Sequence, residues 1–165
     1  MQIAACKNET TYHLYLDLKK AYHSIDRDKT LEVMRKYGVE PRICRYVKET
    51  WNEQMFLLRQ AGFYSEPIDV QRGCTQGDID SPVIFNLVVD AVIRAAKAER
   101  DYGKTRLCFY ADNGLLENKV PSELQRDLDL IVDLFERMGL RTNQMKTKFM
   151  VVRGTQALTA RSQET

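Results

Sequence analysis

The chain alternates between stretches with the two-residue period of a β-strand and stretches with the longer period of an amphipathic helix. Residues 11–18 alternate apolar and polar side chains, which predicts a strand that ends at Asp17. The apolar positions on one face of this strand are Tyr12, Leu14 and Leu16. Residues 147–152 predict another strand near the end of the chain.

Two short helices and a hairpin are predicted after the first strand. The first helix runs from about Asp28, an N-cap candidate, to Gly38, a C-terminal stop. The second begins at Pro41, which suits a first-turn position, and its apolar positions are Ile43, Val47 and Trp51. Residues 54–72 have strand-forming side chains on both sides of Gly62, so they predict a hairpin.

Two longer helices are expected further along the chain. Ser81 and Pro82 form a cap-then-proline start, and residues 83–98 continue as an apolar-rich helix. The other helix begins at a capping box opened by Ser122 and ends at Gly139. Its apolar stripe consists of Leu124, Leu128, Ile131, Phe135 and Met138.

Between these longer helices the pattern predicts a tight hairpin. Residues 105–110 and 115–118 are its strands, and the turn at 111–114 reads Ala-Asp-Asn-Gly, in which Asn-Gly is a strong hairpin signal. The element order is then that of an α+β, ferredoxin-like split βαβ fold, with two helices and a hairpin inserted after the first strand. In this fold the first strand lies beside the tight hairpin, so Asp17 and Asp112 are expected to meet at one edge.

Composition places the chain among globular proteins. Its 165 residues, 44% hydrophobic and 29% charged, fit one soluble domain. The start of the chain has no basic region followed by an apolar run, and no apolar stretch is long enough to span a bilayer. We therefore expect an intracellular protein, nuclear or cytoplasmic, with no membrane partner. Wide spacing of the cysteines favours reduced thiols over a disulfide or zinc role; they are Cys6, Cys44, Cys74 and Cys108.

Charge is distributed unevenly along the chain. The net charge is +2, but residues 19–48 hold nine Lys or Arg against four acidic residues. A stretch of this kind is able to follow a phosphate backbone. Taken alone, it is more typical of solvated helix faces, so it indicates a polyanion partner only together with other signals.

Four patches of chemistry-bearing residues supply those signals. They are Leu16-Asp17-Leu18-Lys19-Lys20-Ala21-Tyr22, then Gln76-Gly77 with Ser81-Pro82 and Phe85-Asn86, then Phe109-Tyr110-Ala111-Asp112-Asn113, and finally Gly139-Leu140 with Asn143 and Lys146-Thr147. Two patches place a carboxylate at the end of an apolar strand, which brings distant Asp residues together around hard cations. In their order, the patches resemble motifs A, B, C and D of reverse transcriptases, most closely those of non-LTR (LINE-type) retrotransposons. The resemblance spans roughly residues 12–152.

The resemblance implies the palm domain of an RNA-directed DNA polymerase. Asp17 and Asp112 match the catalytic carboxylates that bind two Mg²⁺ (or Mn²⁺) ions, with the backbone carbonyl of Leu18 as a further ligand and Asn113 at the next motif C position. Such ions assist the in-line attack of a primer 3′-hydroxyl on the α-phosphate of a deoxynucleotide. Lys146 matches the motif D lysine, for which the proposed catalytic role is protonation of pyrophosphate.

The resemblance also implies residues that bind the nucleotide or the template. Tyr22 matches the aromatic steric gate that collides with a 2′-hydroxyl, although a core tyrosine would give the same pattern. Gln76 and Gly77 match the motif B pair that approaches the templating and incoming nucleotides, where glycine lets the backbone come close. The remaining members of this set are Lys19, Ser81 and Asn86. The implied partners are an RNA or DNA template-primer and a dNTP.

The chain departs from the family pattern in three places. Motif C usually ends in two aspartates, and Asn113 in the second position removes one negative charge near the cations. His23 stands where motif A usually has Asp, while Asp78 and Asp80 precede the Ser-Pro pair where the family favours Pro-Leu. These departures keep a second hypothesis open, a catalytically decayed relic that binds nucleic acid or nothing.

The expected domain organisation is a palm over residues 1–153 followed by a polar tail over residues 154–165. By the resemblance, the N-terminal part of the fingers and the thumb lie outside this chain and are partners of the palm in the full-length protein. An isolated palm is then expected to polymerise weakly or not at all. A third hypothesis is a metal-dependent cyclase or polymerase of another kind, which the Gln-Gly and Ser-Pro pairs disfavour because the fold alone does not demand them.

Overall fold

The computed structural model describes residues 9–75, 77–100 and 105–153, which form an α+β domain. Helices and strands follow one another in the order that the sequence predicts, except for a short additional helix at Ala21–Ser24. The expected polar tail, Cys6 and Gln76 lie outside the described residues. The domain boundary at residue 153 therefore stays a prediction.

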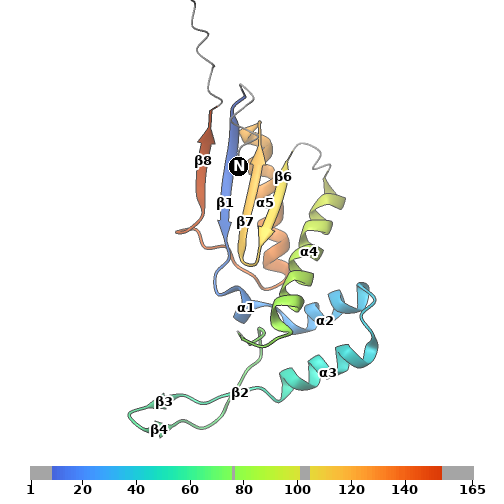
Figure 1. The fold of residues 1–165 in the computed structure, drawn as a ribbon, viewed down its shortest axis with the longest axis vertical. Helices are drawn as coiled ribbons and strands as arrows, with labels where there is room; N and C mark the ends of the chain where they lie inside the picture. Colours follow the sequence, from blue (N-terminus) through green and yellow to red (C-terminus); the bar gives the residue numbers. More distant parts are fainter. Residues whose placement is uncertain (1–8, 76, 101–104, 154–165) are drawn as a thin grey trace, which may run out of the picture.

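A four-stranded antiparallel sheet forms the centre of the domain (Figure 1). The strands lie in the order β6-β7-β1-β8, and their bounds are β1 Thr11–Asp17, β6 Arg106–Tyr110, β7 Asn113–Asn118 and β8 Lys148–Val152. The first strand thus pairs with the second strand of the tight hairpin on one side and with the last strand on the other. This is the strand order of a ferredoxin-like split βαβ fold, so the predicted fold class is confirmed.

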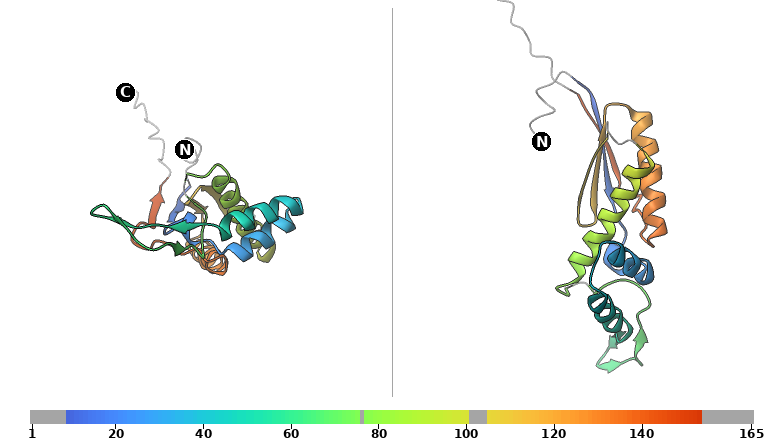
Figure 2. Two further views of the ribbon diagram at one scale, coloured as in Figure 1. Left: turned by 90° about the horizontal axis from the view of Figure 1, so that it is seen from below. Right: turned by 90° about the vertical axis from the view of Figure 1, so that its right-hand side faces the viewer.

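Two long helices cover one face of the sheet, as the side view in Figure 2 shows. They are α4 Ser81–Glu99 and α5 Pro121–Arg137. The Phe109 ring of β6 meets the fully buried Phe135 ring of α5 edge to face, with the ring centroids 5.4 Å apart. Leu14 and Leu116, which pair across β1 and β7, are buried on the same face. Alternate strand residues therefore form the core, and over the described residues the opposite face of the sheet has no helix on it.

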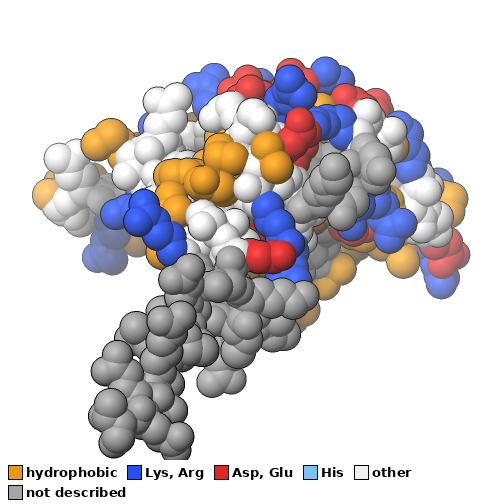
Figure 3. Space-filling view, turned by 90° about the horizontal axis from the view of Figure 1, so that it is seen from above, with side chains coloured by type: hydrophobic (Ala, Val, Ile, Leu, Met, Phe, Trp, Pro, Cys, Tyr) orange, Lys and Arg blue, Asp and Glu red, His pale blue; other side chains and the backbone are white. Residues whose placement is uncertain are grey.

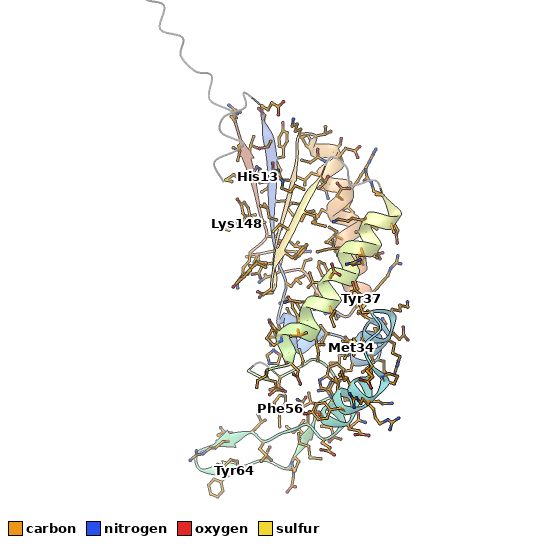
Figure 4. The ribbon with its side chains drawn as sticks, turned by 45° about the vertical axis from the view of Figure 1, so that its right-hand side comes forward. His13, Met34, Tyr37, Phe56, Tyr64 and Lys148 are labelled. Atoms are coloured by element: carbon orange, nitrogen blue, oxygen red, sulfur yellow. The ribbon has the colours of Figure 1, made fainter. Side chains whose placement is uncertain are left out.

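Three shorter helices and a hairpin arm lie below the sheet in Figure 1. The helices are α1 Ala21–Ser24, α2 Arg27–Lys36 and α3 Pro41–Asn52. In the arm, β2 Met55–Phe56 pairs with β5 Ile68–Asp69, and β3 Arg59–Gln60 pairs with β4 Phe63–Tyr64. The predicted hairpin is therefore confirmed. Its strands are exposed throughout, and Figure 4 shows Phe56 and Tyr64 along the arm, away from the core.

Arg27 joins the short helices to the base of the arm. Its guanidinium donates to the carbonyl oxygens of Gly73 (2.9 Å) and Trp51 (2.7 Å) and to Oε1 of Gln54 (2.6 Å). The guanidinium carbon also lies 5.4 Å from the Trp51 ring centroid, and burial lowers the pKa of Arg27. Arg27 is the exception in the basic stretch 19–48, because its other Lys and Arg residues are exposed, as expected of solvated faces.

Three predicted helix starts and one core position were wrong. In α4 the N-cap is Asp80, without a side-chain cap hydrogen bond, so Ser81 is the first helical residue and not the cap. Helix α2 is capped by Asp26 rather than Asp28, because Asp26 has an extended backbone and its carboxylate accepts a hydrogen bond from the Lys29 N–H. In α3, Ile43 is exposed and Cys44 is buried in its place, so the buried face repeats at intervals of three and four residues through Val47 and Trp51. Helix α5 begins without the predicted Ser122 capping box: Val120 is its N-cap, and the Val120 N–H donates to the Asn118 side chain.

The tight turn between β6 and β7 also differs from its prediction. Tyr110 pairs with Asn113, so the two-residue loop is Ala111-Asp112, and Asn113 and Gly114 already belong to β7. Ala111 takes the left-handed conformation, with φ at 51°. Gly114 is needed for packing instead, because a Cβ there would lie 2.5 Å from Cε1 of Phe109.

The surface at the end of the sheet opposite the short helices and the arm has mixed charge (Figure 1 and Figure 3). Figure 3 looks down on this end and shows hydrophobic side chains gathered in one part, with Lys, Arg, Asp and Glu intermingled around them. Ion pairs of this kind include Lys119 with Glu9 and Arg126 with Glu123. In the described part of the chain, no helix combines the length and the apolar character needed to cross a membrane.

Candidate active site

Asp17 and Asp112 lie at the same end of neighbouring strands. Asp17 is the last residue of β1 and pairs with Asn113 of β7. The Leu18 N–H donates to the Asp112 carbonyl oxygen at 3.0 Å, so the main chains of the two predicted metal-binding residues meet here. The side chain of Leu18 is buried in the core, and its backbone carbonyl oxygen is the predicted ligand atom. The meeting of Asp17 and Asp112 at one edge follows from the register of an antiparallel pair.

The Asp17 carboxylate is held by residues from the loop between α5 and β8. Nδ2 of Asn143 donates to Oδ2 of Asp17 at 2.9 Å, and Nζ of Lys146 lies 3.9 Å from Oδ1. The Asp17 side chain is 17% exposed, whereas that of Lys146 is 70% exposed. Lys146 is therefore a solvated cation at the rim of the site, and its ion pair with Asp17 is weak by geometry.

The Asp112 carboxylate has local partners. Nδ2 of Asn113 donates to Oδ1 of Asp112 at 3.2 Å, and Asn113 itself is exposed. The pKa of Tyr22 is raised, first by burial and then by nearby groups that include Cys74 and Asp112. The Asp112 carboxylate therefore acts electrostatically on Tyr22, because its negative charge disfavours the tyrosinate.

Two of the predicted nucleotide-binding residues line one pocket. Tyr22 stacks on Phe85 with the ring centroids 4.7 Å apart, and its ring borders a pocket of about 480 Å³. Asn86, exposed on α4, lines the same pocket, which extends to Tyr110 and Ala111 beside the Asp112 turn. The pocket therefore places Tyr22 and Asn86 beside the turn that carries Asp112, one of the predicted metal-binding residues.

The other members of the predicted binding set lie elsewhere. Gly77, with φ at 106°, and Ser81 line a separate pocket of about 360 Å³ against α3. Ser81 is 3% exposed, so its hydroxyl faces the interior. Lys19 is exposed after β1, where its N–H donates to the Arg141 carbonyl oxygen. Gln76 lies outside the described residues, and the binding roles of all these residues stay predictions.

The departures from the family pattern lie on the surface around the site. Asp78 and Asp80 are exposed at the rim of the pocket that Gly77 lines, and His23 is exposed at the end of α1. Gly73 packs against the His23 backbone so closely that a Cβ would lie 2.5 Å from the His23 Cα. Asp78 and Asp80 add negative charge to the rim of the pocket that Gly77 lines, and this charge would repel a phosphate group.

The donor set at the strand ends fits a hard divalent cation. Among the described residues, no group of three or more His, Cys, Asp or Glu side chains is placed to hold a metal ion. Two carboxylates and a backbone carbonyl are enough for Mg²⁺, because this ion keeps several waters and takes its remaining oxygens from substrate phosphates. The cysteines among the described residues, Cys44, Cys74 and Cys108, have free thiols.

Sequence reasoning assigned no role to two residues that the structure connects to this site. Asn143 was part of the fourth motif, and its position three residues before Lys146 was the only signal available. Arg27 had the appearance of one more surface cation in a basic stretch, yet it contacts the loop that leads into Gly77 through the Gly73 carbonyl oxygen. A single basic residue gives no sequence signal for such backbone contacts.

Comparisons with known proteins agree with this geometry. The model of the family described as "Reverse transcriptase (RNA-dependent DNA polymerase)" matches residues 2–163. A Pol polyprotein from the type-2 retrotransposable element R2DM of Drosophila melanogaster is 31% identical over 147 residues, which are 87% of this chain and 14% of the polyprotein. A Pol polyprotein from the type-1 retrotransposable element R2 of Bradysia coprophila is 27% identical over 81% of this chain and 16% of its own length.

Solved structures show the same fold. Apo telomerase from Candida tropicalis, truncated from its C-terminal domain, superimposes with a TM-score of 0.72 at 12% identity, covering 90% of this chain and 32% of the telomerase. Telomerase of the same organism in complex with a TWJ fragment of telomeric RNA gives a TM-score of 0.72 at 14% identity, covering 87% of this chain and 26% of that one. Since the family match extends over nearly all of its residues and its relatives are retrotransposon polyproteins, the chain belongs to the reverse transcriptase family, in the non-LTR retrotransposon group.

Proposed function

We propose that the chain is the catalytic palm of an RNA-directed DNA polymerase, which transfers deoxynucleotides to a primer 3′-hydroxyl. The observation that carries this proposal is the position of Asp17 and Asp112 at the same end of β1 and the β6–β7 hairpin. The chain spans 14% and 16% of the two retrotransposon polyproteins, and we propose that its activity requires a longer protein. Segments that act as fingers and thumb are proposed as the partners of the palm in that protein.

Reverse transcriptases generally depend on divalent metal ions. We assign two Mg²⁺ or Mn²⁺ ions to Asp17, Asp112, the Leu18 carbonyl oxygen and the side chain of Asn113. When bound, such ions lower the pKa of the attacking hydroxyl and neutralise charge on the phosphates. The half-buried position of Asp17 supports this assignment, because a carboxylate with little access to water interacts more strongly with a cation.

The other residues act by position. Tyr22 presents its ring to the pocket beside Asp112 and would lie under the sugar of an incoming dNTP, where it excludes a 2′-hydroxyl. Lys146 is close enough to Asp17 for its ammonium to reach a leaving pyrophosphate and give up a proton there. Asn86, Gly77, Gln76 and Lys19 are proposed to contact the nucleotide or the template, whereas the buried Ser81 would act only by holding the start of α4.

A template-primer of RNA or DNA is the proposed macromolecular partner. Its support is the family membership together with one structural neighbour, a telomerase in complex with a fragment of telomeric RNA. The exposed Lys and Arg residues between positions 19 and 48 supply cations for a phosphate backbone. An intracellular location stays a prediction.

The test is metal binding by this chain and primer extension by the full-length protein. Asp17→Ala and Asp112→Ala should each weaken Mn²⁺ binding, measured by electron paramagnetic resonance, and should abolish extension, because each removes a carboxylate ligand. Asp129→Ala is the matched control, since Asp129 is an exposed carboxylate on α5. Unchanged Mn²⁺ binding and extension in both site variants would reject the proposal.

A decayed relic is the second candidate function. The observation that favours it is the exposed Asn113 beside Asp112, where a second carboxylate is usual in the family, together with the acids at Asp78 and Asp80. In this case the fold would persist because its core is independent of the site, while the full-length protein would bind nucleic acid or nothing. Extension by the full-length protein distinguishes the two candidates.

A further inference from the structure

Asn143 makes two hydrogen bonds to Asp17, although the two residues are 126 positions apart in the sequence. The Asn143 backbone N–H donates to the Asp17 carbonyl oxygen at 2.7 Å, and its side-chain Nδ2 donates to the Asp17 carboxylate at 2.9 Å. The backbone of Asn143 therefore holds the backbone of Asp17, and the side chain of Asn143 holds the Asp17 carboxylate. Two simultaneous contacts define an orientation that one contact would leave free to rotate.

The segment around Asn143 is itself anchored on both sides. Before it, Thr142 forms a β-bridge with Leu18, and the Lys19 N–H donates to the Arg141 carbonyl oxygen at 2.7 Å. After it, the Asn143 carbonyl oxygen accepts hydrogen bonds from two backbone N–H groups and one hydroxyl; the donors are Lys146 N, Thr147 N and Thr147 Oγ1. The backbone of Asn143 is thus fully engaged, so its side-chain amide is presented to Asp17 from a rigid base.

The contact leaves the two carboxylate oxygens of Asp17 unequal. Oδ2 accepts the Asn143 amide, whereas Oδ1 lies 3.9 Å from the exposed Lys146 ammonium, too far for a direct hydrogen bond. An amide donor orients a carboxylate without adding a positive charge, so the negative charge of Asp17 is kept for a cation. A lysine at position 143 would orient the carboxylate but would compete with the metal.

We propose that Asn143 is a positioning residue, which orients the Asp17 carboxylate so that Oδ1 is presented to a divalent cation. The inference rests on the proposed two-metal function. Both contacts of Asn143 to Asp17 are made by N–H donors, which orient the carboxylate but do not bind a cation. Residues that hold a metal-binding side chain in place from the second layer typically change metal affinity by about 10- to 100-fold when they are removed.

The test compares three variants of this chain with the unmodified chain. Asn143→Leu keeps the shape of the side chain but removes its donor, while Asn143→Ala is the second variant in case leucine does not fit. Thr147→Val is the matched control, because it removes a hydroxyl contact to the Asn143 carbonyl oxygen in the same turn and leaves the amide on Asp17. Each variant is measured twice, by Mn²⁺ titration and by thermal unfolding without metal.

The expected result is a separation of the two measurements. Asn143→Leu or Asn143→Ala should weaken Mn²⁺ binding by about tenfold or more with little change in the unfolding temperature, whereas Thr147→Val should lower the unfolding temperature and leave Mn²⁺ affinity unchanged. Mn²⁺ affinity equal to that of the unmodified chain in the Asn143 variants would overturn the inference. A loss of Mn²⁺ affinity that Thr147→Val shows to the same extent would also overturn it, because the loss would then follow stability alone. If Asp17→Ala also leaves Mn²⁺ binding unchanged, the proposed function has failed instead, so the two failures are distinguishable.

Discussion

The end of β1 and the β6–β7 turn each supply one carboxylate to the candidate site, but they hold it in different ways. Asp17 receives its hydrogen bonds from Asn143, 126 positions away, and lies near Lys146 of the same distant loop. Asp112 is held within a two-residue turn and accepts a hydrogen bond from the adjacent Asn113. One carboxylate is therefore positioned by tertiary contacts and the other by local geometry.

This difference explains where the chain departs from its family pattern. Asn113 is exposed and makes its contact with the residue beside it, so a change from aspartate to asparagine there leaves the packing of the hairpin intact. A change at Asn143 would remove the hydrogen bond that its side chain donates to the Asp17 carboxylate, which is a contact between distant segments. Departures are thus tolerated where the contacts are local and the side chain is solvated.

The largest expected effect is on the stability of the domain, and it tests whether the β6–β7 turn depends on the packing of Gly114 against the Phe109 ring. Gly114→Ala places a Cβ 2.5 Å from the Phe109 ring, which is held in turn by Phe135, so we expect a loss of stability of about 1–3 kcal/mol. Chemical denaturation measures the loss. Adding Phe109→Leu should restore part of it by giving the Cβ room; a double variant no more stable than Gly114→Ala would show that the ring is not the cause.

A second prediction concerns charge at the turn. Asn113→Asp adds a carboxylate beside Asp112, so Mn²⁺ affinity should rise, while the metal-free protein should lose a little stability because two like charges become neighbours. Mn²⁺ titration and thermal unfolding check the two parts. Asn118→Asp would be a poor control because Asn118 is buried, whereas the exposed Gln125→Glu on α5 changes charge away from the site. An unchanged Mn²⁺ affinity would favour the relic hypothesis.

The smallest expected effect is on the pKa of Tyr22, which should respond to the charge of Asp112 and not to that of Asp17. The pKa of Tyr22 is raised by burial and, to a smaller extent, by the charge of Asp112. Asp112→Asn should therefore lower the pKa of Tyr22 towards its ordinary value without reaching it, because the contribution of burial stays. Asp17→Asn should leave this pKa unchanged. A pH titration of Tyr22 by NMR measures both, and equal shifts in the two variants would contradict the assignment of the two carboxylates to distinct surroundings.

Much of the fold was predictable because its signals are local. The alternation in residues 11–18 and the stripe of α5 report the faces that meet the core, and both were confirmed by buried side chains such as Leu16 and Ile131. The helix starts failed at Asp28, Ser81 and Ser122 because the backbone path decides which residue precedes the first turn, and in α5 this residue is Val120, which has no capping side chain. The Asn-Gly pair was misread for a related reason: Gly114 is required by the Phe109 ring, which the sequence of the turn does not reveal.

The sequence by itself determined the family, the order of the elements and the identity of Asp17 and Asp112 as the candidate carboxylates, because residue type and spacing carry that information. Only the tertiary structure decided that Asn143 orients Asp17, that Arg27 binds backbone carbonyls at the base of the arm, and that Ser81 faces the interior. The physical reason is that a hydrogen bond or a buried position between distant segments depends on how the layers pack. No pattern within a single segment specifies that packing.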